Sequence, residues 1–339
     1  MAQRSQLQVV TYHWSEADNS LTRASTGKRN EQVYSASAAA FISTGALIRL
    51  PLEVIHNVLG YLDISTIESV RCLSRNCRLI VDLFPPYRDL TTFAGSVLRV
   101  LHATHLTSTY CIGQLYTVLT NDRCVCCEAF GPYLSLITSE RCCFSCLHDS
   151  KMAPTTLSTA ASTFGLSKNE MEKRIPVVTT VPGIYTIKRT ERRRRLKVVS
   201  VRKALALALE KRTKTQPGGE DHTILNQNAK ALLRHPNDPL PFMVSTPIPY
   251  LNTRNRHTES GVWCRGCELV WYRSSSHRWS SDCFKRVLDT AYLEEEYLRH
   301  FEECEAAREI WGLFVREGKG MEHLHRGRHR EWASRIVER

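Results

Sequence analysis

The sequence predicts a mainly α-helical protein in which small irregular or β elements surround two clusters of cysteine. Three patterns carry this prediction. Apolar residues recur at helical spacing between positions 50 and 84, cysteines gather at 111–146 and 264–304, and residues 287–315 have helical periodicity. We therefore expect a small helical bundle, then a cysteine-rich body, then a long C-terminal helix.

Composition places the chain among ordinary globular proteins. Its 339 residues are 42% hydrophobic and 24% charged. No apolar run approaches the roughly 20 residues of a membrane helix. The first ten residues, MAQRSQLQVV, lack the apolar core of a secretory signal. We expect no membrane partner and a cytoplasmic or nuclear location, or both.

The positive charge is concentrated in one segment. The formal net charge is +12, and residues 188–214 hold twelve Lys or Arg against only Glu191 and Glu210. The rest of the chain is therefore close to neutral. A basic isoelectric point produced by one segment is a weak argument for a nucleic-acid partner.

Residues 1–46 and 47–90 differ sharply in pattern. The first segment is rich in Ser, Thr, Ala and Asn without a sustained period, which predicts a disordered N-terminal tail. In the second segment Pro51 suits a first helical turn, where its missing N–H is not needed. The helix that follows carries an apolar stripe of Ile55, Val58, Leu59 and Leu62.

Two more short helices are expected in the same segment. Ser65 and Glu68 have the spacing of a capping box, which predicts a second helix. Ser74 is a plausible cap for a third helix, and Pro85-Pro86 ends it. Three short helices make a bundle that is too small to be very stable alone.

The order and spacing of these residues resemble the F-box. The matching residues are Leu50, Pro51, Glu53, Val54, Ile55, Leu59, Leu62, Val70, Arg71, Ser74 and Arg75. The resemblance implies docking onto the linker subunit of a Skp–cullin–F-box ubiquitin ligase. It implies that Leu50, Pro51, Glu53, Ile55, Leu59 and Leu62 lie in or beside that contact. A helical core that binds nothing is the alternative.

The strongest chemical pattern lies in the cysteine-rich region, residues 91–187. Cys124, Cys127, Cys143 and Cys146 form C-x2-C-x15-C-x2-C. Four thiolates at this spacing predict a tetrahedral structural zinc site, with no open position for catalysis. Cys126 and Cys142 are adjacent thiols that could be misassigned as ligands, and buried thiols without a metal are the alternative. A RING is disfavoured, because no further Cys follows His148 until Cys264.

The same region continues with LITSERCCFSCL, FGLS and PGIY, an order similar to filamentous-fungal F-box proteins with Cys-rich bodies. That similarity implies lineage and no catalytic activity.

Residues 188–216 predict a basic amphipathic helix with Val198, Val201, Leu205, Ala208 and Leu209 on one face. The helix would have a cationic first turn. Such clusters serve as nuclear localisation signals or contact phosphates. The alternative is that the basic residues form a solvated helix surface with no partner. The candidate signal is Lys188, Arg189, Arg192, Arg193, Arg194, Arg195 and Lys197.

Residues 217–260 contain five prolines between Pro236 and Pro249, which predicts an extended linker. A second zinc module is expected over 261–320, followed by a tail at 321–339. Its expected ligands are Cys264, Cys267, His300 and Cys304, with the last two one turn apart on a long helix. Cys283 and His277 compete as ligands.

Two classes of function fit these patterns. The first is a non-catalytic ubiquitin-ligase adaptor with one or two structural zinc ions, which binds the linker subunit and, through it, the cullin. The second is a zinc-dependent nucleic-acid-binding protein that uses the four-cysteine site and the basic helix. The second class leaves the F-box pattern unexplained. The sequence contains no serine elbow, P-loop or paired-carboxylate motif that would indicate an enzyme. The adaptor is therefore the favoured interpretation, and its substrate is not specified by the sequence.

Overall fold

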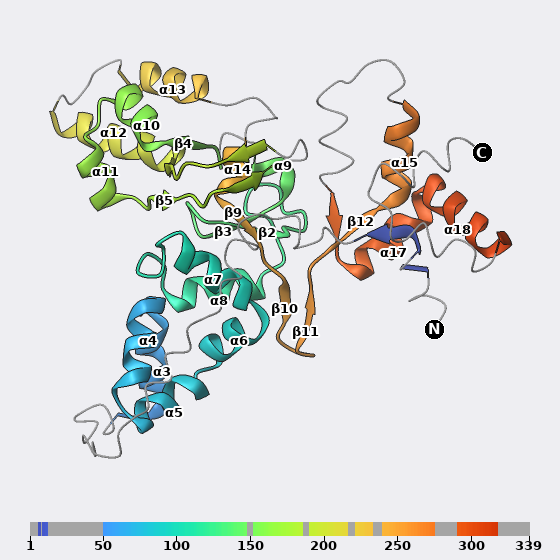
Figure 1. The fold of residues 1–339 in the computed structure, drawn as a ribbon, viewed down its shortest axis with the longest axis horizontal. Coiled ribbons are helices and arrows are strands. Elements are labelled where there is room, and N and C mark those ends of the chain that lie inside the picture. The colour runs from blue at the N-terminus through green and yellow to red at the C-terminus, as the bar shows by residue number, and fades with distance from the viewer. Residues whose placement is uncertain are drawn as a thin grey trace.

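The computed structural model describes residues 6–7, 9–12, 50–147, 152–185, 190–215, 221–232, 239–274 and 290–317. Helices predominate, and the strands form small sheets of two or three. The predicted mainly α-helical fold with small β elements is confirmed. Figure 1 shows a helical arm (blue to teal), a mixed body (green to yellow, with residues 240–259 in gold to orange) and a C-terminal module (orange to red, with one blue strand). None of the described helices has the length and apolar run that a bilayer-spanning segment requires.

The helical arm begins with the three predicted short helices, α3 (Leu52–Gly60), α4 (Ile64–Leu73) and α5 (Arg75–Leu83). Asp63, rather than Ser65, caps α4, because its carboxylate accepts hydrogen bonds from the backbone N–H and the hydroxyl of Thr66. Ser74 caps α5 as predicted and accepts from the N–H of Cys77 at 3.1 Å.

Three further helices continue the arm: α6 (Pro85–Phe93), α7 (Gly95–Ala103) and α8 (Ile112–Thr120). Pro85 and Pro86 end α5 and also begin α6, where proline is tolerated. One apolar core extends from Ile55 in α3 to Leu251 in β10 (Tyr250–Asn252). The arm and the body therefore share a core.

The centre of the body is a three-stranded antiparallel sheet. Strand β2 (Tyr133–Ser135) pairs with β3 (Glu140–Cys142) and with β9 (Ser245–Pro247). The short helices α9 (Phe144–Leu147) and α14 (Leu240–Met243) belong to the same region. Strand β9 is an edge of the sheet, which is where a strand proline is tolerated.

The expected Pro-rich linker at 217–260 is wrong for the part that the structure describes. Leu240, Met243, Val244 and Ile248 are buried in the main core, and β9 contributes a strand. Further on, β10 and β11 (His257–Glu259) form a hairpin. Proline content indicated an extended chain, but the apolar residues between the prolines bind that chain to the body.

The described residues between 152 and 232 form an α/β lobe. Its sheet has the order β4 (Pro154–Thr156), β8 (Lys197–Ser200), β5 (Val178–Thr179). A second apolar core joins this lobe's helices. They are α10 (Leu157–Phe164), α11 (Lys168–Arg174), α12 (Val201–Thr215) and α13 (Asp221–Ala231). Strands β6 (Gly183–Tyr185) and β7 (Thr190–Arg192) form a hairpin beside it.

The expected basic helix at 188–216 is corrected to a strand followed by a helix. Val198 and Val199 lie in β8 and are buried, and α12 begins only at Val201. Adjacent β-branched residues suit a strand that is paired on both sides. Arg193, Arg194 and Arg195 therefore lie between β7 and β8, outside any helical first turn.

The C-terminal module contains β12 (Val262–Cys264), α15 (Arg265–Ser274), β13 (Ala291–Tyr292), α17 (Glu294–Glu303) and α18 (Glu305–Glu317). The expected long helix is broken at Cys304, whose backbone is extended with φ −83° and ψ 96°. A continuous helix would hold Cys304 and His300 at one fixed spacing. The break lets the cysteine turn independently of α17.

The expected disordered tail at 1–46 is also corrected for its first part. Strand β1 (Thr11–Tyr12) pairs antiparallel with β12, and Val9 and Val10 are buried in the C-terminal module. Residues 13–49 and the expected tail at 321–339 lie outside the described residues.

Candidate functional site

The arm presents an apolar surface on α3, α4 and α5. In the described part of the chain twelve large apolar side chains are exposed. Eight of them lie between positions 50 and 83: Leu50, Leu52, Val54, Val58, Tyr61, Leu73, Leu79 and Leu83. We call these eight the arm surface. Exposed apolar side chains that gather in one region mark interaction sites more often than scattered ones do.

The six predicted docking residues separate into two groups. Leu50, Pro51 and Glu53 are exposed, whereas Ile55 and Leu59 are buried in the core of the arm and Leu62 packs against that core. Ile55 and Leu59 therefore hold the helix in place and offer little contact area. Sequence periodicity placed Val58 on the inner stripe, yet 47% of it is exposed.

The first metal site is assembled in the body. Cys124, Cys127, Cys143 and Cys146 have sulfur atoms within 4.8 Å of one another, as predicted. Cys124 and Cys127 lie in a turn before β2, while Cys143 and Cys146 follow β3 at the start of α9. The hairpin of β2 and β3 therefore returns the second pair to the first.

Neither competing thiol belongs to this site. Cys142 is fully buried, and its Sγ lies 3.6 Å from the carbonyl oxygen of Tyr133, across the hairpin. The backbone N–H of Cys126 donates to Cys124 Sγ at 3.4 Å, so Cys126 serves the site through its backbone.

The second metal site joins three elements of the C-terminal module. Cys264 ends β12, Cys267 lies in α15, His300 lies in α17, and Cys304 occupies the break before α18. All four ligand atoms lie within 4.8 Å of one another. Cys283 and His277 lie outside the described residues.

The measured spacings fit zinc. Tetrahedral zinc with Zn–S bonds of about 2.3 Å separates two sulfurs by about 3.8 Å. Cys127 Sγ and Cys143 Sγ are 3.6 Å apart, and Cys264 Sγ and Cys304 Sγ are 3.8 Å apart. His300 Nε2 lies 3.3 Å from Cys267 Sγ. Both ligand sets are closed, which suits a structural ion.

The ligands within each site shift one another's pKa. Hydrogen bonding with Cys143 lowers the pKa of Cys124 to about 4, whereas burial and the neighbouring Cys124 raise the pKa of Cys146. Hydrogen bonds with Cys264 and Cys304 raise the pKa of His300 to about 10. A divalent cation among the ligands would favour four thiolates in one site, and three thiolates with a neutral imidazole in the other.

Gly266 allows the second site to close. It lies between Cys264 and Cys267, and a Cβ on it would collide with the backbone of Ala307 in α18. The absence of a side chain lets α15 and α18 approach, which brings the cysteine pair toward Cys304.

The two metal sites are tied to each other by an ion pair. Arg123 precedes Cys124, and its guanidinium lies 2.8 Å from the Glu296 carboxylate in α17. Glu259 in β11 accepts a hydrogen bond from the N–H of Glu294 at the start of the same helix. The C-terminal module therefore contacts both the turn of the first metal site and the β10–β11 hairpin.

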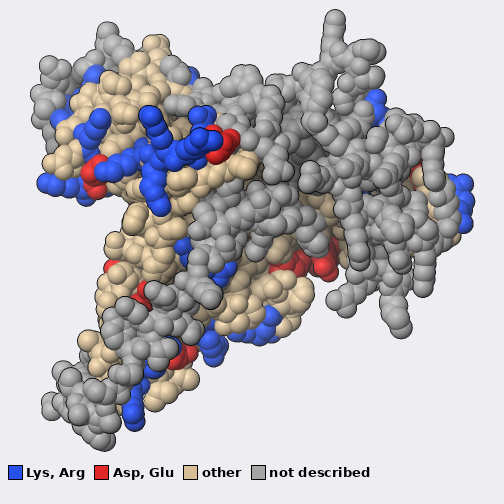
Figure 2. Space-filling view, viewed as in Figure 1, with Lys and Arg blue, Asp and Glu red and all other residues tan. Residues whose placement is uncertain are grey.

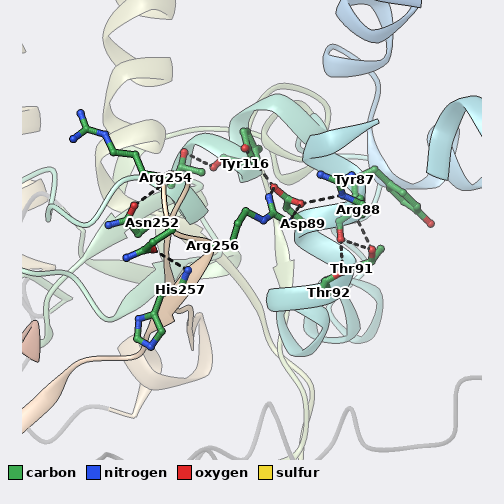
Figure 3. Close-up of polar contacts among 12 residues, drawn as sticks. Tyr87, Arg88, Asp89, Thr91, Thr92, Tyr116, Asn252, Arg254, Arg256 and His257 are labelled. Carbon is green, nitrogen blue, oxygen red and sulfur yellow. Dashed lines mark hydrogen bonds and ion pairs between the residues drawn. The ribbon is translucent and has the colours of Figure 1, made fainter. Parts of the chain in front are cut away.

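A second polar contact fixes the arm against the same hairpin (Figure 3). Asp89 in α6 is fully buried, and both of its carboxylate oxygens accept from the Arg256 guanidinium at 2.7 Å. The Arg256 guanidinium also lies over the Phe93 ring, 5.2 Å from its centroid. Arg256 has φ 59° at the turn between β10 and β11, a conformation that is uncommon for a residue with a side chain. The turn therefore aims Arg256 at α6.

This ion pair predicts a pH dependence of stability. Burial alone would raise the pKa of Asp89, but its bonds with Arg256 and then Arg88 outweigh burial and lower it from 3.8. A carboxylate with a lowered folded-state pKa stabilises the fold above its unfolded pKa, and this contribution is lost as pH falls through the folded value. The destabilisation caused by Arg256→Gln should be full at neutral pH. It should shrink as pH falls through the pKa of Asp89 in the variant, which burial without Arg256 raises, and shrink further toward the lowered pKa in wild type.

Thermal unfolding of wild type and variant side by side measures this difference. Arg254→Gln is the matched control, since Arg254 lies two residues away in the same turn and points away from Asp89 (Figure 3). An Arg256→Gln protein as stable as the control at pH 7 would contradict the assigned role.

The basic run lies on the surface of the α/β lobe. Arg192, Arg193, Arg194, Arg195 and Lys197 are exposed, while Lys188 and Arg189 lie outside the described residues. Figure 2 shows Lys and Arg side chains gathered over this lobe. Several pair with acidic neighbours, as Lys197 does with Glu172 and Lys211 with Glu170. The nuclear signal stays a prediction.

Comparison with known proteins agrees with the arm. Its short helices leave large apolar side chains exposed between positions 50 and 83. A family model for the F-box domain matches residues 47–89, so the chain contains an F-box domain. Asp89 is the last residue of that match. F-box domains serve in general in substrate recognition by Skp–cullin–F-box ubiquitin ligases, as non-catalytic subunits. No curated protein and no solved structure matches the chain.

Proposed function

We propose that this protein is a non-catalytic substrate-recognition adaptor of a Skp–cullin–F-box ubiquitin ligase. In this proposal the F-box domain docks the linker subunit, and the cysteine-rich body presents a protein substrate. The observation that carries the proposal is the arm surface, which lies within the segment that the F-box family model matches. An apolar surface of this kind gains free energy when a partner removes it from water.

The body supports the role of a receptor because it is joined firmly to the F-box domain. The arm and body share one apolar core, and the Asp89–Arg256 pair fixes the last residue of the domain to the β10–β11 hairpin. Two structural metal sites would stiffen the rest of the receptor. A receptor held at a fixed orientation delivers its substrate to a fixed place, which docking through a flexible linker would not.

Docking is tested with the purified linker subunit and the Leu50→Ala/Pro51→Ala double variant. Truncation of an interface anchor typically costs about 2 kcal/mol or more, so we expect at least a tenfold loss of affinity by calorimetry. Val54→Ala should also weaken binding of the linker subunit. Unlike the double variant, it keeps Pro51, which precedes the first residue of α3.

Val270→Ala is the matched control, because Val270 is similarly exposed but lies in the C-terminal module. It should bind like wild type. Metal content should be the same in all variants. Equal binding by wild type and the double variant would refute the proposed docking surface.

A further inference from the structure

The N-terminal segment belongs to the C-terminal module. Strand β1 pairs antiparallel with β12, with Thr11 opposite Cys264 and Tyr12 opposite Trp263. Strand β12 pairs with β13 on its other side. The metal ligand Cys264 therefore lies on the central strand of a sheet whose outer strand comes from the beginning of the chain (Figure 1).

The segment is also part of the apolar core around the second metal site. Val10 is fully buried, and Val9 is almost so. Both pack in one cluster with Cys264, Tyr297 and Ile310, which come from three elements of the module. Removal of this segment would expose the interior beside the ligands.

Two hydrogen bonds connect the segment to the metal-binding residues. The Tyr297 hydroxyl donates to the carbonyl oxygen of Val10 at 3.0 Å and lies 3.6 Å from Cys264 Sγ. Arg265, which follows Cys264, donates from Nε to the carbonyl oxygen of Thr11 at 3.0 Å. Tyr297 is fully buried in α17, one turn before His300. One side chain thus touches both the N-terminal segment and a ligand sulfur.

We propose that residues 9–12 are a component of the C-terminal metal site, so that zinc binding at this site and docking of the N-terminal segment depend on each other. A two-residue strand makes too few hydrogen bonds to hold its place unless the partner strand is already ordered. The ion orders the end of β12 and the start of α15, and the segment covers them. Coupling between two binding events is reciprocal, so each must strengthen the other by the same factor.

Two variants of the full chain test the proposal: deletion of residues 1–12, and Tyr297→Phe, which keeps the ring and removes only the hydroxyl. Zinc per protein is followed during titration with a chelator, with the four-cysteine site as the internal reference. We expect both variants to release one of two ions at a chelator concentration at least about tenfold lower than the concentration that wild type requires. A peptide of residues 1–12 should restore retention in the deletion variant.

Tyr292→Phe is the matched control. Tyr292 stacks on His300 with ring centroids 4.6 Å apart, and phenylalanine keeps that contact. It should release zinc like wild type. The reverse coupling is read by limited proteolysis: Cys304→Ser should make residues 6–12 cleavable.

Three results would overturn the proposal. The first is a deletion variant that keeps both ions with wild-type resistance to the chelator. The second is a Tyr297→Phe variant that behaves like Tyr292→Phe; it decides the question even if the deletion variant fails to fold. The third is a Cys304→Ser variant whose residues 6–12 resist proteolysis as well as they do in wild type.

Discussion

Replacement of Cys124 by serine is expected to unfold the centre of the body and to remove one of two zinc ions. A structural zinc site contributes folding free energy on the order of 10 kcal/mol or more. The local core cannot compensate for that loss. Four of its eight buried members are cysteines, and the others are Tyr133, Phe144, Leu147 and Met152. A bound metal ion would therefore take the place of a larger apolar core in this region.

Elemental analysis and circular dichroism of freshly reduced protein measure the result. Cys126→Ser is the matched control, because it removes a neighbouring thiol that lies outside the quartet. The control should keep two ions and the wild-type melting curve. A Cys124→Ser protein that keeps both would show that the four thiols do not hold a structural ion.

The ligand sets of both metal sites could be predicted because they depend on local spacing. A C-x2-C pair places its two thiols on one side of an ion wherever it occurs. The ligands of the second site were predicted correctly although the helix was not. His300 and Cys304 lie close to the cysteine pair even though the helix ends at Cys304. Periodicity detected the apolar faces of α17 and α18 but not the change in backbone direction at Cys304.

Features that depend on distant residues could not be predicted. Strand β1 is two residues long, and its partner lies about 250 positions further along the chain, so no local pattern marks it. No local pattern marks Asp89 as a buried charge, because Arg256, which binds both of its carboxylate oxygens, lies 167 positions further along the chain. The prolines around Pro247 indicated a linker. The sequence does not show that residues 245–247 pair with β2, which lies more than 100 positions earlier in the chain.

Arg141 belongs to the same group, and it explains how the arm, the first metal site and the Pro-rich segment are held together. It lies in β3 beside Cys142, and its side chain is almost completely buried. The three guanidinium nitrogens donate to four backbone carbonyls: Val118 in α8 at 3.0 Å, Gly131 at 2.6 Å, Ile248 at 3.4 Å and Pro249 at 2.7 Å. Burial lowers its pKa to about 10, so it remains charged at neutral pH.

Arg141→Leu is therefore expected to destabilise the body by about 3 kcal/mol or more, since each buried carbonyl left without a donor costs about 1–3 kcal/mol. Arg141→Lys should recover little of this loss, because one ammonium cannot span carbonyls that a planar fork reaches from two sides. Urea unfolding at pH 7 measures both variants. Arg202→Leu is the control: Arg202 in α12 pairs with Glu140 in β3 at a solvent-exposed position, and such pairs contribute at most about 1 kcal/mol. If Arg141→Leu unfolded at the same urea concentration as this control, the carbonyls would be satisfied without the arginine. The Pro-rich segment would then be held by its apolar side chains alone.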